Sequence, residues 1–431
     1  MTHTDYTKDI LNIKDKNVYF YDNCLETIKI KDTETKIFHG YLTYIPSSCP
    51  KCGCINEGFD DIIKWNWKRN CKIKIPKVSN YNTILLLDKQ RFLCKHCNKT
   101  FIASTSLVNP HKQISNNTRI SVILDLMQKG SEKDMALRNN ISTNSVNRIL
   151  DDISHDKYVK NNGTLPTSFG IDEFDATKDT KSKMAFIIVN QDKKNIFDIN
   201  NSRLSKDIDN YFRRYSKQQR DNVKYITMDL YKPYYILMKK LFKNAVLIPD
   251  RFHIVIQFRN ALDKTRIMLC KKSNPNYNKL KKYWKLILKN EDDLSNRLFY
   301  SKHFRKEVSE KYIVTYLLNT NTELKVTYNY YQGLLKSLKN RNKQKFLNII
   351  HHPNSSISIH AKKCNKTLLE FEKYIVNAFD YDLSNGIVEG TNNIIKQVKH
   401  NACGYRKFSH LKARIMLIKG LYNPLISQKR E

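Results

Sequence analysis

One stretch near the C-terminus decides how the fold is interpreted, Ser384-Asn385-Gly386-Ile387-Val388-Glu389-Gly390-Thr391-Asn392-Asn393. It predicts a loop that turns into a helix with a single acid near its start. Residues at three- and four-residue spacing share one side of a helix. Here that polar side holds Glu389, Asn392, Asn393 and Lys396. A lone Glu on such a helix is ordinarily a solvated charge, so it indicates catalysis only if other carboxylates converge on it.

Two further acids stand in, or at the end of, apolar runs that predict β-strands. Asp172 lies inside the strand predicted over 169–174, and Asp229 ends the strand predicted over 223–229. The other elements expected here are strands over 184–189 and 196–199, a strand with its exit over 245–253, and helices over 204–216 and after Pro233. Three antiparallel strands followed by helix–strand–helix–strand is the order of the ribonuclease H-like fold, although other α/β domains share it.

That order would make the first and fourth strands neighbours, with Asp172 and Asp229 side by side and the Glu389 helix packed beside them. Carboxylate oxygens suit Mg²⁺ or Mn²⁺. Two such ions about 3.5–4 Å apart serve an in-line phosphoryl displacement. Each acid also has an ordinary explanation: a buried or capping Asp172, a helix N-cap at Asp229 and a solvated Glu389. Their joint placement along the chain favours a shared catalytic role.

Two CxxC pairs near the N-terminus have the spacing of zinc ligands: Cys49, Cys52, Cys94 and Cys97. Two-residue spacing lets both thiolates of a pair reach one ion, and four thiolates complete a tetrahedral structural Zn²⁺ site. Short strand-like runs at 72–75 and 83–87 lie between the pairs, so residues 46–105 predict a zinc ribbon that contacts DNA. Unconnected free thiols are the alternative, and Cys54 and Cys71 are candidate substitutes as ligands.

Residues 106–160 change to a helical pattern with two serine caps. Apolar residues repeat at helical spacing from about residue 118, Ser131 can cap a second helix, and Ser142 can cap a third. A tight turn before the last helix is typical of helix-turn-helix domains, although small helical bundles share the pattern. In such a domain the residues expected to face the major groove of DNA are Thr143, Asn144, Asn147 and Arg148.

The composition favours a polyanionic partner. The chain has 431 residues, with 76 Lys and Arg against 41 Asp and Glu and a net charge of +35. Lys and Arg displace condensed counterions from phosphate backbones, so nucleic acid is the expected partner; a coding bias towards Lys and Asn is the alternative. No run predicts a signal peptide or a membrane span. We therefore expect a cytoplasmic protein whose ten cysteines are metal ligands or free thiols.

The chain is thus expected to be a multidomain α+β protein. The expected segments are 1–45 without an assigned role, the zinc ribbon over 46–105, the helix-turn-helix over 106–160, the first part of the ribonuclease H-like catalytic domain over 165–260, an all-helical insertion over 261–379, and the last part of the catalytic domain over 380–431. This last part holds Glu389, a basic turn with Arg406 and Lys407, and a final amphipathic helix.

Several motifs in this order resemble those of bacterial insertion-sequence transposases of the DDE class, in particular the ISL-three (ISL3) group. The motifs are Gly170-Ile171-Asp172-Glu173-Phe174, Met228-Asp229, Pro249-Asp250-Arg251-Phe252-His253, Asn385-Gly386-Ile387-Val388-Glu389-Gly390-Thr391-Asn392 and Gly404-Tyr405-Arg406. The resemblance runs from about Cys49 to the C-terminus. The sequence departs from the family pattern in the extra Cys54 and in Asn385-Gly386, where Asn-Ala is more usual.

The resemblance implies a role for each matched residue. Asp172, Asp229 and Glu389 would be the catalytic triad and bind two Mg²⁺ or Mn²⁺ ions. Asp250 and His253 would support the triad or contact DNA, and the basic turn of Arg406 and Lys407 would lie near DNA.

The activity implied is that of a DNA transposase. It would bind the terminal inverted repeats of its insertion sequence and catalyse metal-dependent strand cleavage and strand transfer. Its partners would be the double-stranded DNA of the element ends and of the target, and it would assemble on DNA as a homodimer or higher oligomer, at the bacterial nucleoid. A non-catalytic DNA-binding regulator and a structure-selective nuclease are the alternatives.

Overall fold

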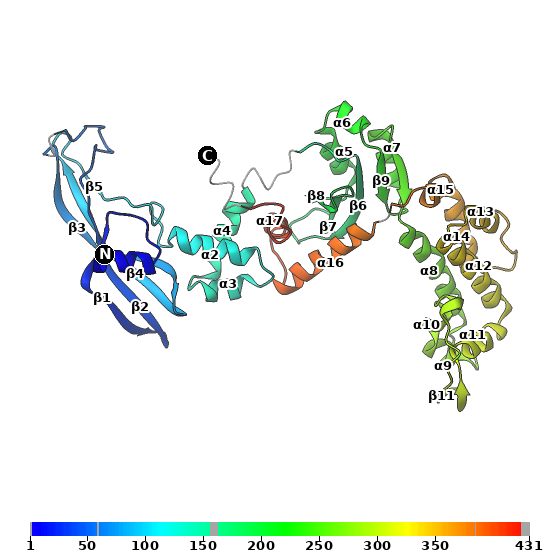
Figure 1. Ribbon diagram of the computed structural model, residues 1–431. Coiled ribbons are helices and arrows are strands. Elements are labelled where there is room, and N and C mark those ends of the chain that lie inside the picture. The colour runs from blue at the N-terminus through cyan, green and yellow to red at the C-terminus, as the bar shows by residue number, and fades with distance from the viewer. Residues whose placement is uncertain (1, 58–59, 156–162, 384, 424–431) are drawn as a thin grey trace. The chain divides into compact units, whose positions relative to one another are not determined.

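The computed structural model describes residues 2–57, 60–155, 163–383 and 385–423 (Figure 1). The chain divides into two compact units. The terminal unit contains residues 1–160, 177–179 and 394–431, and the central unit contains residues 161–176 and 180–393. The expected segment 380–431 is therefore split, because its larger part groups with the N-terminal residues.

A five-stranded sheet forms the first part of the terminal unit, in the order β1-β2-β4-β3 with β5 paired to β4. Its elements are α1 (His3–Ile10), β1 (Val18–Ile30), β2 (Thr33–Leu42), β3 (Ile62–Val78), β4 (Tyr81–Cys94) and β5 (Thr100–Ile102). β2 pairs in parallel with β4, with Phe38 opposite Leu85. Residues 1–45, which had no assigned role, thus supply two strands of the sheet that carries the cysteine pairs.

The β3–β4 hairpin is much longer than the two short runs that the sequence predicted at 72–75 and 83–87. Its turn is at Ser79 and Asn80, both with positive φ, as two-residue hairpin turns require. Along β3 the buried residues are mostly confined to its second half, and the middle of the strand is largely exposed. The hydrophobic pattern therefore revealed only the half of this strand that packs on the core.

Three helices follow where the sequence predicted them: α2 (Asn116–Leu126), α3 (Glu132–Arg138) and α4 (Thr143–His155). The Ser131 hydroxyl accepts the backbone N–H of Asp134, and the Ser142 hydroxyl accepts that of Ser145 at 3.2 Å. The last helix, α17 (Phe408–Ile418), shares their hydrophobic core through Ala413, Met416 and Leu417. The bundle therefore has a fourth helix that comes from the far end of the chain.

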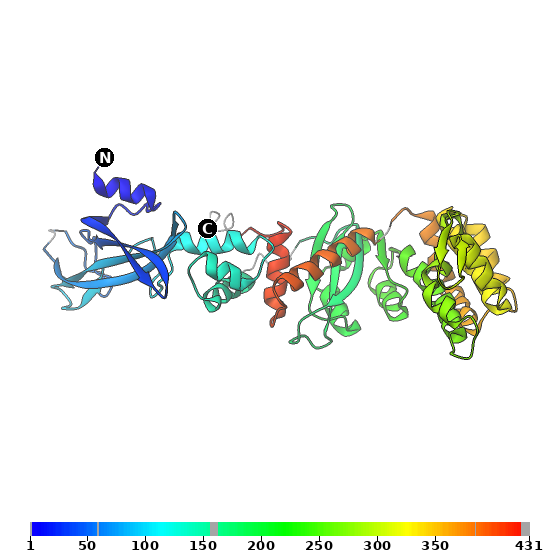
Figure 2. The ribbon, with the colours of Figure 1, turned by 90° about the horizontal axis from the view of Figure 1, so that it is seen from below.

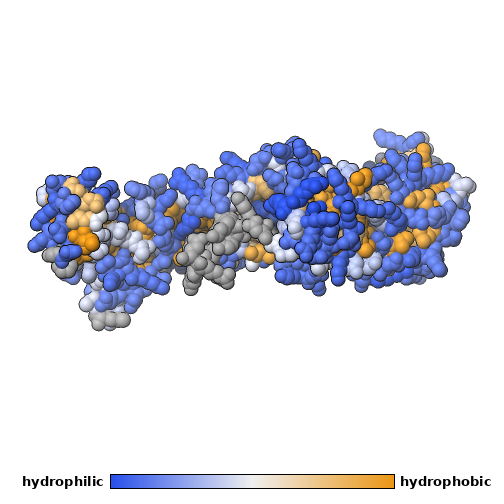
Figure 3. Space-filling model, turned by 90° about the horizontal axis from the view of Figure 1, so that it is seen from above, coloured by the Kyte–Doolittle hydropathy of each residue, from blue (hydrophilic) through white to orange (hydrophobic). Residues whose placement is uncertain are grey.

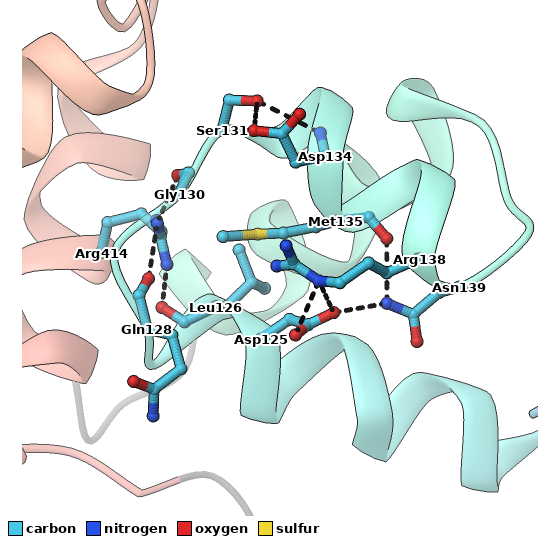
Figure 4. Close-up of polar contacts among 10 residues, drawn as sticks. All are labelled: Asp125, Leu126, Gln128, Gly130, Ser131, Asp134, Met135, Arg138, Asn139 and Arg414. Carbon is cyan, nitrogen blue, oxygen red and sulfur yellow. Dashed lines mark hydrogen bonds and ion pairs between the residues drawn. The ribbon is translucent and has the colours of Figure 1, made fainter. Parts of the chain in front are cut away.

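Arg414 of α17 is the polar centre of this bundle (Figure 4). It is 1% exposed, and its guanidinium donates to the carbonyl oxygens of Leu126, Gln128 and Gly130 in the α2–α3 connection. A cation at this place satisfies carbonyls that the end of α2 leaves free. On the other side of the connection Asp125 accepts hydrogen bonds from Arg138 and Asn139, which ties α2 to α3.

The central unit contains a second five-stranded sheet, in the order β10-β9-β6-β7-β8 (Figures 1 and 2). Its elements are β6 (Ser168–Asp175), β7 (Met184–Asn190), β8 (Asn195–Asn200), α5 (Ser205–Arg213), α6 (Lys217–Asp221), β9 (Tyr225–Met228), α7 (Lys232–Leu241) and β10 (Val246–Pro249). β6, β7 and β8 pair antiparallel, whereas β9 is parallel to both β6 and β10. The first and fourth strands are therefore neighbours, and only α6 was not predicted.

The segment expected to be an all-helical insertion is not purely helical, since it contains a hairpin of β11 (Phe299–Ser301) and β12 (Lys306–Val308). The helices are α8 (Arg251–Leu269), α9 (Tyr277–Lys282), α10 (Trp284–Ile287), α11 (Glu310–Asn319), α12 (Thr322–Lys339), α13 (Lys343–His351), α14 (Ile359–Glu370) and α15 (Glu372–Asp380), with a 3₁₀ turn at Glu291–Asp293. α8 begins directly after β10, and one hydrophobic cluster extends from Leu165 to Phe379. Sheet and helices thus share a continuous core.

The face of the molecule in Figure 3 is largely hydrophilic, with small hydrophobic areas between the hydrophilic ones. Among the helices of the described segments, none is both long enough and apolar enough to cross a lipid bilayer.

Candidate active site and cysteine site

The parallel pairing of β6 and β9 brings Asp172 and Asp229 together. Gly170 pairs with Thr227 in this register, and each aspartate lies two residues further along its strand direction. Side chains alternate along a strand, so positions two apart point to the same face. Asp229 follows directly after β9, which ends at Met228.

The next strand brings a third aspartate to the same edge of the sheet. β10 pairs in parallel with β9, with Pro249 opposite Met228, so Asp250 and Asp229 come directly after paired residues. His253 lies in the first turn of α8, three residues after Asp250. Asp250 and His253, which belong to one of the family-like motifs of the sequence, both lie next to Asp229 in the structure.

These acids lie close enough together to raise one another's pKa. Burial, followed by the charges of Asp172 and Asp250, raises the pKa of Asp229 to about 8. Burial also raises the pKa of Asp172 and that of Asp250. Like charges at close range disfavour ionisation, and such clusters are typical of sites that bind cations or act on charged substrates.

Asp229, Asp250 and His253 form a candidate metal group in the central unit, with ligand atoms that all lie within 4.8 Å of one another. His253 Nε2 is 3.2 Å from Asp229 Oδ1. Asp172 and Glu389 are not members of that group among the described residues. The three acids of the predicted triad therefore do not form one closed cluster of this size.

Glu389 lies in the first turn of α16 (Gly386–Asn401) and is exposed. Its charge contributes to the raised pKa of Asp250, so the two acids are electrostatic neighbours. One turn later on the same helix, Asn392 donates its side-chain amide to Asp172 Oδ2 at 2.7 Å. The helix that carries Glu389 is thus hydrogen-bonded to the first aspartate.

Asn385, just before α16, fastens the start of the helix to β6 and β9. Its side chain donates to the carbonyl of Ile171 at 3.2 Å and accepts the Thr227 hydroxyl, and its backbone N–H faces Asp250 Oδ1 at 3.4 Å. The close approach depends on Gly170, where an added Cβ would lie 2.7 Å from Val388 and 2.8 Å from Asn385.

Asn385 and Asn392 lie inside the stretch that decides the fold, but the sequence predicted no contact for either. The available signal was the helical spacing of Asn392 from Glu389, which put both on one polar side. The contact with Asp172 lies 220 residues away along the chain, and nothing in the pattern of either segment indicated it. Thr227 and Gly170 were likewise not recognised as positions that determine where the helix sits.

The four cysteines of the two CxxC pairs converge in the terminal unit. Cys49, Cys52, Cys94 and Cys97 form one group within metal-binding distance, and the Sγ atoms of Cys49 and Cys97, and of Cys52 and Cys94, are 3.8 Å apart. Tetrahedral Zn–S bonds of about 2.3 Å place sulfurs about 3.8 Å apart. The donor set therefore fits zinc. Cys54 and Cys71, the alternative ligands, lie outside this group.

The residues of the predicted helix-turn-helix and of the basic turn that are expected to contact DNA belong to the terminal unit. On α4, Thr143, Asn144 and Arg148 are exposed and Asn147 is half-buried. Arg406 and Lys407 are exposed as well. Lys407 also forms an ion pair with Asp151 of α4, at 2.9 Å. The structure thus leaves most of these side chains accessible and ties the basic turn to α4.

Two comparisons with known proteins bear on this chain. A protein of Lactococcus lactis subsp. lactis named ATP-dependent protease is 34% identical over 121 residues, which cover 27% of this chain and 39% of that protein. The match thus spans about two fifths of that relative. The sequence profile of the transposase family that groups ISL3 elements matches residues 169–415. This segment is more than half of the chain and contains Asp172, Asp229, Asp250 and Glu389. The chain therefore belongs to the ISL3 group of DDE transposases.

Proposed function

We propose that this transposase binds the terminal inverted repeats of its element, cleaves a DNA strand at each end and transfers the end to target DNA. The observation that carries the proposal is the arrangement around β6. Asp172 and Asp229 follow a paired position of two parallel strands, and the helix with Glu389 is hydrogen-bonded to Asp172 through Asn392. The strand order β10-β9-β6-β7-β8 supports a ribonuclease H-like domain for this chemistry.

The proposed catalytic residues are Asp172, Asp229 and Glu389, with Mg²⁺ or Mn²⁺ as cofactor. The donor set fits hard divalent ions, because carboxylate oxygens are the ligands that these ions prefer. Burial raises the pKa of Asp172 and of Asp229, and a bound cation would favour their ionised forms. When bound, two such ions activate an oxygen nucleophile and stabilise the leaving oxygen of a phosphodiester. The protein's own part is to hold the carboxylates in place: Glu173 N–H and the Asn392 amide fix Asp172.

The terminal unit would recognise the DNA ends. Three observations support this role: a zinc-compatible cysteine group, a four-helix bundle with an accessible α4, and the excess of basic residues in the chain. In this proposal Thr143, Asn144, Asn147 and Arg148 read the major groove, and Arg406 and Lys407 contact the phosphate backbone. Because transposition joins two ends, the active assembly on DNA would contain at least two copies of the chain.

The proposal is tested by strand cleavage of a labelled duplex that carries the end of the element. We expect nicking at the end with Mg²⁺, none with chelator, and none with Glu389→Gln at any metal concentration. Glu389→Gln should bind the duplex as tightly as the unaltered protein, because it lies outside the residues proposed to contact the ends. Tight binding without nicking by the unaltered protein, even with Mn²⁺, would favour a non-catalytic regulator. Nicking independent of the end sequence would favour a structure-selective nuclease.

A further inference from the structure

The group of Asp229, Asp250 and His253 has the composition of a mixed oxygen and nitrogen metal site. The two aspartates come directly after adjacent parallel strands, and the histidine comes from the first turn of the following helix. Metal–ligand bonds of about 2.1 Å place adjacent ligand atoms about 3.0 Å and opposite ones about 4.2 Å apart. All three ligand atoms lie within 4.8 Å of one another, so small side-chain rotations bring them into range.

The contact between Asp229 and His253 supports a shared ion. Oδ1 of Asp229 is buried and accepts no hydrogen bond from any described residue, although His253 Nε2 is only 3.2 Å away. The two atoms are therefore close without the alignment of a hydrogen bond. Leaving a buried carboxylate oxygen without a donor costs stability. Two ligands that face the same cation would be arranged in this way.

The charge balance of the site points in the same direction. In a chain of net charge +35, none of Asp172, Asp229 and Asp250 forms an ion pair with a Lys or Arg of the described segments; their only such contact is with His253. Asp250 is 7% exposed. Buried carboxylates are ordinarily paired or bound to a metal.

We propose that Asp250 and His253 are direct ligands, together with Asp229, of one divalent cation, and that the imidazole makes this position prefer Mn²⁺ to Mg²⁺. The proposal rests on the proposed function, since this ion would be one of those that serve strand cleavage. It assigns a metal-binding role to two residues beyond the predicted triad. Imidazole nitrogen binds later divalent metals better than Mg²⁺, which prefers oxygen ligands.

The test is pulsed electron paramagnetic resonance of the zinc-loaded full-length protein with one equivalent of Mn²⁺. A directly bound imidazole gives a ¹⁴N modulation of the Mn²⁺ signal. We expect that modulation in the unaltered protein, its loss in His253→Ala, and its retention in His351→Ala. His351 is a matched control, because it forms another histidine–carboxylate pair in the same unit, with Glu372 at 3.0 Å.

Calorimetric titration supplies a second readout. His253→Ala and Asp250→Asn should each weaken Mn²⁺ binding at least about tenfold, and His253→Ala should affect Mg²⁺ less. Glu389→Gln should keep the ¹⁴N modulation, since Glu389 lies outside the group. Mn²⁺ bound by the unaltered protein without ¹⁴N modulation would overturn the proposal whether or not the variants fold. Cleavage of the DNA ends without the ¹⁴N modulation would support the proposed function and contradict the metal site. The ¹⁴N modulation without cleavage of the DNA ends would support the metal site and contradict the proposed function.

Discussion

The packing of α16 against β6 leads to a specific prediction for Gly170→Ala. A Cβ at this position would lie 2.7 Å from Val388 Cγ2, 2.8 Å from Asn385 Oδ1 and 2.8 Å from Thr227 Oγ1. Carbon atoms in contact ordinarily lie about 3.5–4 Å apart, so the start of α16 would have to retreat by roughly 1 Å. Overpacking of this kind costs about 1–3 kcal/mol of folding free energy.

The same displacement should impair catalysis more than it impairs folding. Glu389 follows Asn385 by four residues, and the backbone N–H of Glu389 donates to the Asn385 carbonyl at 2.8 Å. A shift at Asn385 is therefore passed directly to the helix that carries Glu389. A misplacement of about 1 Å at a reacting centre lowers the rate by roughly 10²-fold. We expect single-turnover cleavage of end DNA to fall by about that factor, while binding of the same DNA stays unchanged.

Gly390→Ala is the matched control. Gly390 is on the same helix, next to Glu389, and a Cβ there would meet no heavy atom within 4 Å. Because Ala is a better helix former than Gly, this variant should gain about 0.5–1 kcal/mol in stability. Urea unfolding measures both effects. Cleavage by Gly170→Ala within threefold of the unaltered protein, or equal damage from both variants, would refute the packing argument.

Three further predictions concern other parts of the chain. Cys49→Ser should lose the bound zinc, measured by metal analysis of the purified protein, whereas Cys71→Ser, outside the cysteine group, should retain it. Arg414→Met should destabilise the four-helix bundle by about 3–5 kcal/mol and abolish binding of end DNA, since three carbonyl oxygens lose their donor. Equal binding of end DNA by this variant would show that the Arg414 contacts are not needed for it. In the presence of chelator, the free energy of unfolding should fall as the pH rises from about 4 towards 8. The reason is that burial raises the folded-state pKa of Asp229 to about 8, so in this range the folded protein holds a proton that the unfolded chain releases. Asp229→Asn should flatten that dependence in denaturant unfolding measured at several pH values.

Elements with a strong local signal could be predicted from the sequence. The strands of the central sheet are apolar runs, and β7 is buried at six of its seven residues. The serine caps at 131 and 142 and the turn between them located the helices α3 and α4. These features depend on residues that are close together in the sequence, and hydrophobic periodicity and capping motifs reveal such local patterns.

Features that depend on distant partners could not be predicted. β1 and the first half of β3 carry few buried residues, because one face of this sheet is exposed. The alternation of hydrophobic and polar residues along these strands is therefore weak. α17 was predicted as an amphipathic helix, but its apolar residues do not specify which helices they contact. Arg414 gave no signal at all, since a buried arginine whose partners are backbone carbonyls has no complementary acid for the sequence to reveal.

Hydrogen bonds from backbone N–H groups help the acids of the candidate site to lie close together in the folded chain. Hydrogen bonds from Asn385 N–H and Phe252 N–H partly offset the effect of burial on the pKa of Asp250, and the Glu173 N–H does so for Asp172. The donor at Asn385 belongs to the start of α16, where helix geometry leaves backbone N–H groups free and favours negative charge. Asp229 has no such compensation: burial and the neighbouring carboxylates all raise its pKa. A bound cation would relieve this repulsion, and Asp229 is also the carboxylate that His253 faces at 3.2 Å.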